Sequence, residues 1–445
     1  MKIQHPQAWT IPILISLASI NGLIKALTGI RYFPLLIDIV LIIVLLVGLA
    51  IRFRNNHPNV GFLDLLALLF IFIAVIEIFN PNIPSFQAGI EGFRKFSFMM
   101  IGFFIGRYVV ETVTAIKRIV WVILIVSFIL ALYGIKQYMI PTALDYRLID
   151  LSNASRVTFM MGGHIRAFST LSGPFHLGIY LVVSILLLLA IFLRNRRFWF
   201  LALILGIPQI IALLMTVTKS NWGALIAGGM VLIFLSARRP LRLFLRMTLL
   251  SIVAIGLIFG ALQVTQSIPE FRTLNTGLLA LINPLSAPTF VLRLDLWRDT
   301  VLPLIGEAIL IGYGTGSAGE GLSNLFLNTN RIYVTSHNLL FKIQLELGII
   351  GLILFLIFLS FCILHIWRAN RSLKNPFLLV IRDWSIAITV AILVSGLTGA
   401  ILDAYPINLL YWLIIGVSTR LYLLEPQEST TREPLNLVFQ QNKVT

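Results

Sequence analysis

Long apolar segments recur along this chain, and no other feature restricts its possible folds so strongly. A helix of about 20 apolar residues crosses the hydrocarbon core of a membrane. The composition agrees, because 58% of the 445 residues are hydrophobic and only 12% are charged. A soluble domain is about a quarter charged, and one with this composition would expose too much apolar surface. The sequence therefore predicts an all-α, polytopic integral membrane protein.

Counting about 20 apolar residues per span predicts about twelve transmembrane helices. We expect them at 9–29, 33–51, 60–79, 96–112, 117–138, 175–193, 198–217, 222–237, 248–267, 339–366, 377–399 and 406–424. The apolar run from Trp9 continues well past the length of a signal-peptide core, which favours a first membrane helix over a cleaved signal. Asn21 and Lys25 make it the most polar of the predicted spans.

Short basic segments between the apolar runs indicate the orientation. If the spans alternate, one side receives the basic breaks 51–57, 115–118, 194–198, 237–246 and 367–374. The positive-inside rule makes that side cytoplasmic, and both termini then lie there. The net charge of +16 is explained by this distribution, so we expect no nucleic-acid binding. The polar tail 425–445 is expected to be disordered and cytoplasmic.

Two long segments, 139–174 and 268–338, then lie on the outer side of the membrane. Long loops without a function are uncommon in a compact protein. Within the second loop, residues 290–310 alternate apolar and charged side chains with helical spacing, which predicts an amphipathic helix near the membrane surface. We interpret residues 1–424 as one transmembrane domain whose active site is capped by these two loops.

Several basic side chains fall on this outer side, where the positive-inside rule does not place them. Arg293 and Arg298 belong to the predicted amphipathic helix, and their spacing fits a functional role as well as a structural one. Arg166 precedes one membrane segment and Lys219 begins another. Taken alone, each is typical of an interfacial residue that anchors to lipid headgroups.

The segment Thr335–Gly351, TSHNLLFKIQLELGIIG, places polar residues at the mouth of an apolar helix, where they are costly. His337 lies at the outer mouth, and an imidazole there can accept a proton from a hydroxyl group. Gly348 and Gly351 share a helical face with His337, which predicts close approach of another helix. Glu346 lies on the opposite face and is interpreted as structural.

Two other patterns in the sequence say less about function. The formal GxGxxG at Gly314, Gly316 and Gly319 lacks the βαβ unit of a dinucleotide site, so a structural turn is favoured. The sequence has no HExxH and no CxxC motif, and the spacing of Asp145 and Asp150 does not suit a shared divalent ion. We therefore expect neither a metal nor a cofactor.

The segment SHNLLFKIQLELGIIGLILF resembles the signature of the O-antigen ligase and polymerase (Wzy/WaaL-like) superfamily. In that family a His-Asn pair precedes a helix with a Glu-x-Gly-x-x-Gly end, matched here by His337, Asn338, Glu346, Gly348 and Gly351. The segments RAFSTLSGPFHLGIYL, TKSNWGAL and RLDLWRDTVLPLIGEAILIGYGTG resemble further family segments in the same order. The resemblance covers roughly residues 150–360, and the chain departs from it at Lys219-Ser220-Asn221, where the family often has Ser-Arg.

The resemblance implies a GT-C-like glycosyltransferase of the bacterial inner membrane. Such an enzyme moves a glycan from undecaprenyl pyrophosphate to a hydroxyl acceptor, lipid A-core or a growing polysaccharide, on the periplasmic face. The transfer would be metal-independent and inverting. The implied roles are general base for His337, pyrophosphate binding for Arg166 and Arg293 with help from Lys219 and Arg298, and support from Asn338 and Glu346.

Three alternatives stay open at this point. A polysaccharide polymerase of the same superfamily needs the same donor site and differs mainly in its acceptor. A protein O-oligosaccharyltransferase differs in the same way. A solute transporter would need ionisable residues at mid-membrane and a duplicated set of interrupted helices, and we find no internal duplication.

Overall fold

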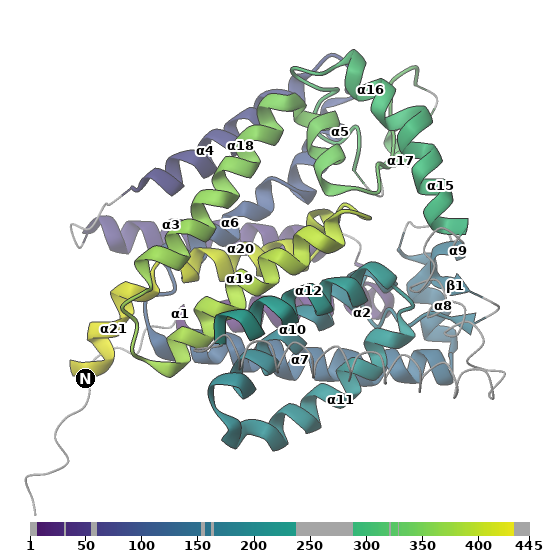
Figure 1. Ribbon diagram of the computed structural model, residues 1–445. Coiled ribbons are helices and arrows are strands. Elements are labelled where there is room, and N and C mark those ends of the chain that lie inside the picture. The colour runs from purple at the N-terminus through teal and green to yellow at the C-terminus, as the bar shows by residue number, and fades with distance from the viewer. Residues whose placement is uncertain are drawn as a thin grey trace, which may run out of the picture.

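The computed structural model describes residues 7–30, 33–54, 60–152, 156–161, 164–236, 288–319, 322–327 and 329–430. These residues form a bundle of long helices (Figure 1), which confirms the predicted all-α class. Within the described ranges the only strands are β1 (Met160–Met161) and β2 (His164–Ile165), which pair antiparallel in one short hairpin.

Eight helical segments of the described residues are long and apolar enough to cross a membrane. They are α3 (Phe33–Arg54), α4 (Phe62–Ile76) continued by η1 (Glu77–Phe79), α7 (Val113–Met139), α10 (Pro174–Arg194), η3 (Arg196–Phe198) continued by α11 (Trp199–Met215), α12 (Lys219–Ser236), α18 (Leu339–Ala369) and α19 (Pro376–Gly396). A ninth candidate is the pair α1 (Gln7–Ser19) and α2 (Asn21–Thr28), which is bent by 62°. The protein is therefore a multi-pass membrane protein.

The structure supports eight or nine spans where the sequence predicts about twelve. The predicted span 248–267 lies outside the described residues. The segments 96–112 and 406–424 contain only short helical elements, of which α6 (Ile101–Tyr108) and α20 (Ile407–Ser418) are the longest within them. These two helices pack backbone to backbone inside the bundle, with an added Cβ at Gly106 only 2.3 Å from the carbonyl oxygen of Leu413. Apolar composition alone does not separate such buried helices from lipid-facing ones.

Most of the short helices gather at one end of the bundle, opposite α21 (Leu421–Thr430) (Figure 1). They are α5 (Phe86–Lys95), α8 (Ala143–Asp150), α9 (Arg156–Phe159), α15 (Pro288–Leu296), the π-helix η6 (Trp297–Val301), α16 (Leu302–Glu307) and α17 (Ser323–Phe326). The turns η2 (Phe98–Met100) and η7 (Ile401–Asp403) lead into α6 and α20. The helix expected at 290–310 is present as one continuous helical segment from Pro288 to Glu307, formed by α15, η6 and α16, with a π-helical turn at its centre. Beyond Thr430, the predicted tail lies outside the described residues.

The long helix α18 is broken at Gly348, whose φ of 65° and ψ of −171° are not helical. A break frees backbone groups that must find new partners where water is absent. The N–H of Tyr313 donates to the carbonyl of Leu345 at 2.7 Å, and the N–H of Ile349 donates to the carbonyl of Ile309 at 2.8 Å. The segment after α16 is therefore fastened to α18 at the break.

The glycine-rich turn after α16 is a structural turn, as the sequence predicts from the absence of a βαβ unit around its GxGxxG pattern. The N–H of Gly314 donates to the carbonyl of Glu346 at 3.1 Å, and Gly312, Gly314 and Gly316 all have positive φ. The expected role of Gly348 in admitting another helix was wrong. A Cβ at Gly348 would lie 2.0 Å from the carbonyl oxygen of Leu310, so this glycine admits the turn and not a helix.

The substitution Gly348→Ala should destabilise the protein. Alanine in this backbone region costs about 1–3 kcal/mol, and its Cβ would also collide with the Leu310 carbonyl. Thermal unfolding of the purified protein in detergent should show a lower melting temperature than wild type. Gly306→Ala is the matched control, because a Cβ added at Gly306 in α16 meets nothing within 4 Å. Equal melting temperatures for the two variants would contradict this account of the break.

Candidate functional site

A cavity of about 640 Å³ opens at the end of the bundle where the short helices gather. Its volume is within the range of pockets that bind small molecules. Its lining includes Arg166, Lys219, Arg293 and His337, which come from four separate parts of the chain. The fold thus brings together the four residues whose spacing or family resemblance first drew attention to them.

The lining of this cavity is strongly basic. Among the described residues that line it are six lysine and arginine side chains, Lys25, Arg94, Lys95, Arg166, Lys219 and Arg293. The only carboxylate in the lining is Asp403, and it already forms a 3.2 Å ion pair with the buried Lys342. Positive charge in a partly buried site favours an anionic ligand.

Arg166 is held in place by backbone carbonyl groups. Its guanidinium donates to Thr216 at 2.9 Å, to Thr158 at 3.0 Å and to Val217 at 3.2 Å. Three of its five N–H donors are used in this way, and two remain for a ligand. Burial, and then the charge of Arg293, lower the pKa of Arg166 to about 10, so it is still a cation at neutral pH.

Arg166, Lys219 and Arg293 form what we call the first cationic cluster. Lys219 is the first residue of α12, and the charges of Arg293 and Arg166 both act on it. Arg293 lies in α15, on the other side of the undescribed segment 237–287. Because these like charges repel one another, an anion bound among them would be stabilised by all three.

The two residues next to His337 in the chain are each fixed by a hydrogen bond. The carbonyl of Ser336 accepts a hydrogen bond from the Trp297 indole at 2.7 Å. The side chain of Asn338 caps α18 by accepting from the N–H of Leu340 at 2.8 Å. His337 itself has a φ of 49°, which is uncommon for a residue with a side chain.

The three non-glycine residues with positive φ in the described chain are Ser169, Val217 and His337. Val217 and His337 line the cavity, and Ser169 precedes Thr170, which also lines it. This conformation is costly, above all for the β-branched Val217, and it persists only where the surrounding structure enforces it. Such positions concentrate at functional sites.

Trp297 links Arg293 to the segment that carries His337. Arg293 and Trp297 are four residues apart across α15 and η6, so they lie on the same side of the helix. The Trp297 indole reaches Ser336, and its ring packs edge-on against Phe341 at 5.6 Å. These contacts keep the Arg293 helix against the beginning of α18.

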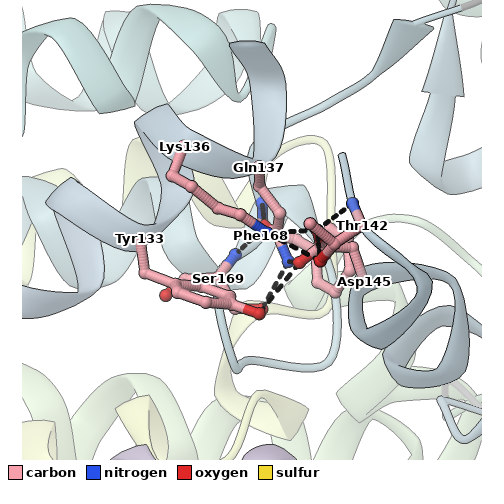
Figure 2. A network of polar contacts seen from close by, with 7 residues as sticks. All are labelled: Tyr133, Lys136, Gln137, Thr142, Asp145, Phe168 and Ser169. Carbon is pink, nitrogen blue, oxygen red and sulfur yellow. Dashed lines mark hydrogen bonds and ion pairs between the residues drawn. The ribbon is translucent and has the colours of Figure 1, made fainter. Parts of the chain in front are cut away.

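A polar network holds the loop that contains Arg166 (Figure 2). Gln137 of α7 accepts hydrogen bonds from the N–H groups of Phe168 and Ser169 at 3.2 and 2.6 Å, and donates to the Ser169 carbonyl at 3.0 Å. Its amide also donates to the buried Asp145 of α8 at 3.1 Å. The positive φ of Ser169 is thus enforced from α7.

Asp145 is the centre of this network. Besides Gln137, its carboxylate accepts from Lys136 at 2.6 Å, from Tyr133 at 2.9 Å and from Thr142 at 2.7 Å (Figure 2). Burial by itself would raise the pKa of Asp145, but these hydrogen bonds hold it below its usual value. The carboxylate therefore stabilises the loops around the cavity.

Three candidates from the sequence do not line the cavity. The Arg298 side chain is 71% exposed and pairs with Asp295 and Asp299 on the surface. Glu346 is buried and forms a 2.6 Å ion pair with Lys342. Asn338 acts on the site through its cap of α18.

Lys25, Arg94 and Lys95 also line the cavity, and sequence reasoning missed them. They come from the bent first span and from the end of α5, about seventy residues later. The one signal in the sequence was Lys25, an ammonium group within a predicted membrane span. No spacing rule connects it to Arg94 and Lys95.

The substitution Asp145→Asn should destabilise the fold by about 1–3 kcal/mol, because it leaves buried donors without their charged acceptor. The wild-type pKa is lower in the folded state, so Asp145 stabilises the protein above pH 3.8 and loses this effect as the pH falls through the folded-state value. The difference in melting temperature between the two proteins should therefore be constant near pH 7 and should shrink as the pH falls below 3.8. Asp150→Asn is the control, because Asp150 pairs with Arg156 on the surface. A constant difference at every pH would contradict this role.

Comparison with known families adds an independent observation. Residues 207–356 match the family model described as O-antigen ligase (Wzy_C). No curated protein matches the chain. The matched segment contains Lys219, Arg293 and His337, and the match confirms the resemblance noted in the sequence. Because the match is to an enzyme family, the solute-transporter alternative is set aside.

Proposed function

We propose, from the premise that the chain is a membrane enzyme of the O-antigen ligase family, that it transfers a glycan from undecaprenyl pyrophosphate to a hydroxyl acceptor. The family implies glycan transfer of the ligase or polymerase type and lipid-linked substrates. The acceptor is lipid A-core or a growing polysaccharide. The observation that carries the proposal is that Arg166, Lys219, Arg293 and His337 line one basic cavity.

We place this cavity on the periplasmic side of the inner membrane, with both termini in the cytoplasm. The first residues of α10, α12 and α18 lie at or beside the cavity. The far ends of the long helices carry basic residues, such as Arg194 in the last turn of α10 and Arg368 in that of α18. This distribution supports the positive-inside orientation. Twelve spans and outer loops at 139–174 and 268–338 remain part of the proposal.

The first cationic cluster binds the pyrophosphate of the donor. A guanidinium group is planar and can donate two parallel hydrogen bonds to phosphate oxygens. Arg166 has two N–H donors left after its backbone contacts, and Arg293 and Lys219 add charge on the same ligand. As the bond to the sugar breaks, negative charge grows on the pyrophosphate, and these cations stabilise it most in the transition state.

His337 acts as the general base. The acceptor hydroxyl oxygen attacks the anomeric carbon, and the bond from that carbon to the pyrophosphate oxygen breaks. The hydroxyl proton passes to the imidazole, and the electron pair of the broken bond leaves with undecaprenyl pyrophosphate. A direct displacement of this kind inverts the anomeric centre. The residues named supply both the base and the electrostatic stabilisation, so the proposed reaction needs no metal.

Ligase and polymerase share this chemistry and differ in the acceptor. Loss of a ligase should leave long polymer on the carrier lipid. Loss of a polymerase should leave single repeat units on the final acceptor. Analysis of the glycans in a deletion strain therefore distinguishes the two.

The substitution His337→Ala should reduce glycan transfer by a factor of ~10²–10⁴, because the acceptor hydroxyl loses its base. The measurement is transfer from a purified lipid-linked glycan to candidate acceptors by the reconstituted full-length protein. Normal transfer by this variant would contradict the role of His337. The control is His365→Ala, since His365 lies on the same helix but bonds to the carbonyl of Thr419, away from the cavity. Wild-type transfer should persist in EDTA.

The substitution Arg293→Lys should reduce transfer by about 10–100-fold, because a single ammonium cannot replace the two parallel hydrogen bonds of a guanidinium. The same reconstituted assay measures it. Arg156→Lys is the matched control, since Arg156 lies near the cavity but pairs with Asp150 on the surface. If Arg293→Lys transfers glycan as fast as Arg156→Lys, Arg293 serves as a lipid anchor and not as a pyrophosphate ligand.

A further inference from the structure

A second group of basic side chains lies in the same cavity. Lys25 comes from α2, and Arg94 and Lys95 end α5. Arg94 and Lys95 are consecutive residues, and both line the cavity together with Lys25. We call these three residues the second cationic cluster.

The two clusters come from different elements of the fold. Arg166 lies in the loop before α10, Lys219 begins α12 and Arg293 lies in α15. The second cationic cluster comes from α2 and the end of α5, where Arg94 pairs with Asp38 of α3. The cavity of about 640 Å³ is therefore lined by cations from two different sets of elements.

The two kinds of cation in the second cluster differ in their surroundings. Arg94 is fixed by an ion pair with Asp38, in which Nε lies 2.5 Å from a carboxylate oxygen. A second nitrogen of the same guanidinium lies 3.4 Å from a carboxylate oxygen of Glu91. Lys25 is half-buried, and within the described part of the chain its ammonium group forms neither a hydrogen bond nor an ion pair. Burying an ammonium group without an acceptor is costly, and a bound anion would remove that cost.

The helix that carries Lys25 has an exposed apolar side. Leu27 is 66% exposed, and Ile30, just after α2, is 49% exposed. Leu27 lies two residues from Lys25 and therefore faces away from the side of α2 that lines the cavity. On the next helix, α3, Leu36 and Ile39 are also exposed. In a membrane protein such a surface contacts lipid chains, so the chains of a bound lipid can pack beside α2 while its anionic group enters the cavity.

We propose that the second cationic cluster is an acceptor subsite that binds a phosphate or pyrophosphate group carried by the acceptor lipid. This inference rests on the proposed function, in which the first cationic cluster holds the pyrophosphate of the donor. Two lipid anions bound in one cavity would bring the acceptor hydroxyl and the donor sugar together beside His337, which lines the same cavity. Phosphate binding would thus select the acceptor.

Binding is measured first, without donor and without turnover, on the full-length protein in nanodiscs. The probes are phosphorylated lipid A-core, the same lipid after phosphatase treatment, and an undecaprenyl-pyrophosphate glycan. The double variant Lys25→Gln with Lys95→Gln should bind the phosphorylated acceptor about tenfold or more weakly than wild type. Its binding of the dephosphorylated lipid should be unchanged. If the acceptor is a second carrier-linked glycan, the variant should lose the second equivalent of that lipid and keep the first.

Controls separate lost charge from lost folding. Arg147→Gln removes one charge from the exposed surface of α8, outside the cavity lining, and should bind every probe as wild type does. Lys25→Arg with Lys95→Arg retains the charges and should retain most of the binding. Equal melting temperatures of the Gln and Arg double variants would show that folding is intact. If the Gln double variant does not fold, Lys25→Gln alone is compared with Lys25→Arg.

Transfer kinetics give the second readout. The Gln variants should raise KM for the acceptor and leave KM for the donor unchanged. A raised donor KM, or equal binding of phosphorylated and dephosphorylated lipid by wild type and variant, would overturn the acceptor subsite. If the variants transfer normally with unchanged binding, only this inference fails. If wild type transfers no glycan, the proposed function fails while the binding measurement still decides whether the second cluster is a phosphate site.

Discussion

The break in α18 at Gly348 is the constraint on which the rest of the site depends. In a bilayer the backbone groups freed by a break have no water to bond, so another segment must supply partners. Here the turn after α16 supplies them, through Tyr313 and Ile309. That turn continues back along the chain into the helices that carry Trp297 and Arg293. A single glycine in a non-helical conformation therefore ties α15, η6 and α16 to the first half of α18, the helix that follows His337.

The cationic side chain of Arg166 is oriented by neutral groups, so no carboxylate within the described residues cancels its positive charge. Arg166 is oriented by backbone carbonyls, and its loop is fixed by Gln137. The carboxylates nearby have other partners. Asp145 accepts a hydrogen bond from Gln137, which holds the Arg166 loop, and Asp403 pairs with Lys342. This arrangement leaves two N–H donors of Arg166 available to a ligand. It also makes the empty site electrostatically unfavourable, which is typical of binding sites for strongly charged groups.

The residues that sequence reasoning found and missed have a common explanation. His337 could be found because an asparagine and a glutamate with glycines follow it in a fixed local order, within one helix. Arg298 is close to Arg293 in sequence, yet it points to solvent and pairs with Asp295 and Asp299, because successive helical residues face different directions. The predicted count of about twelve spans includes the segments of α6 and α20, which the structure shows as short helices buried within the bundle; a helix buried among other helices is as apolar as one that faces lipid.

The sequence by itself determined that the chain is an all-helical membrane protein, that it carries the local signature of a glycan-transfer family, and that His337 lies just before the helix of that signature. These properties depend on composition and on contacts within about one or two helical turns. Only the tertiary structure decided that Arg166, Lys219 and Arg293 form one cluster, and that Lys25, Arg94 and Lys95 form another in the same cavity. Charges act through space, and the bend after α1 and the break in α18 set distances that no sequence spacing records.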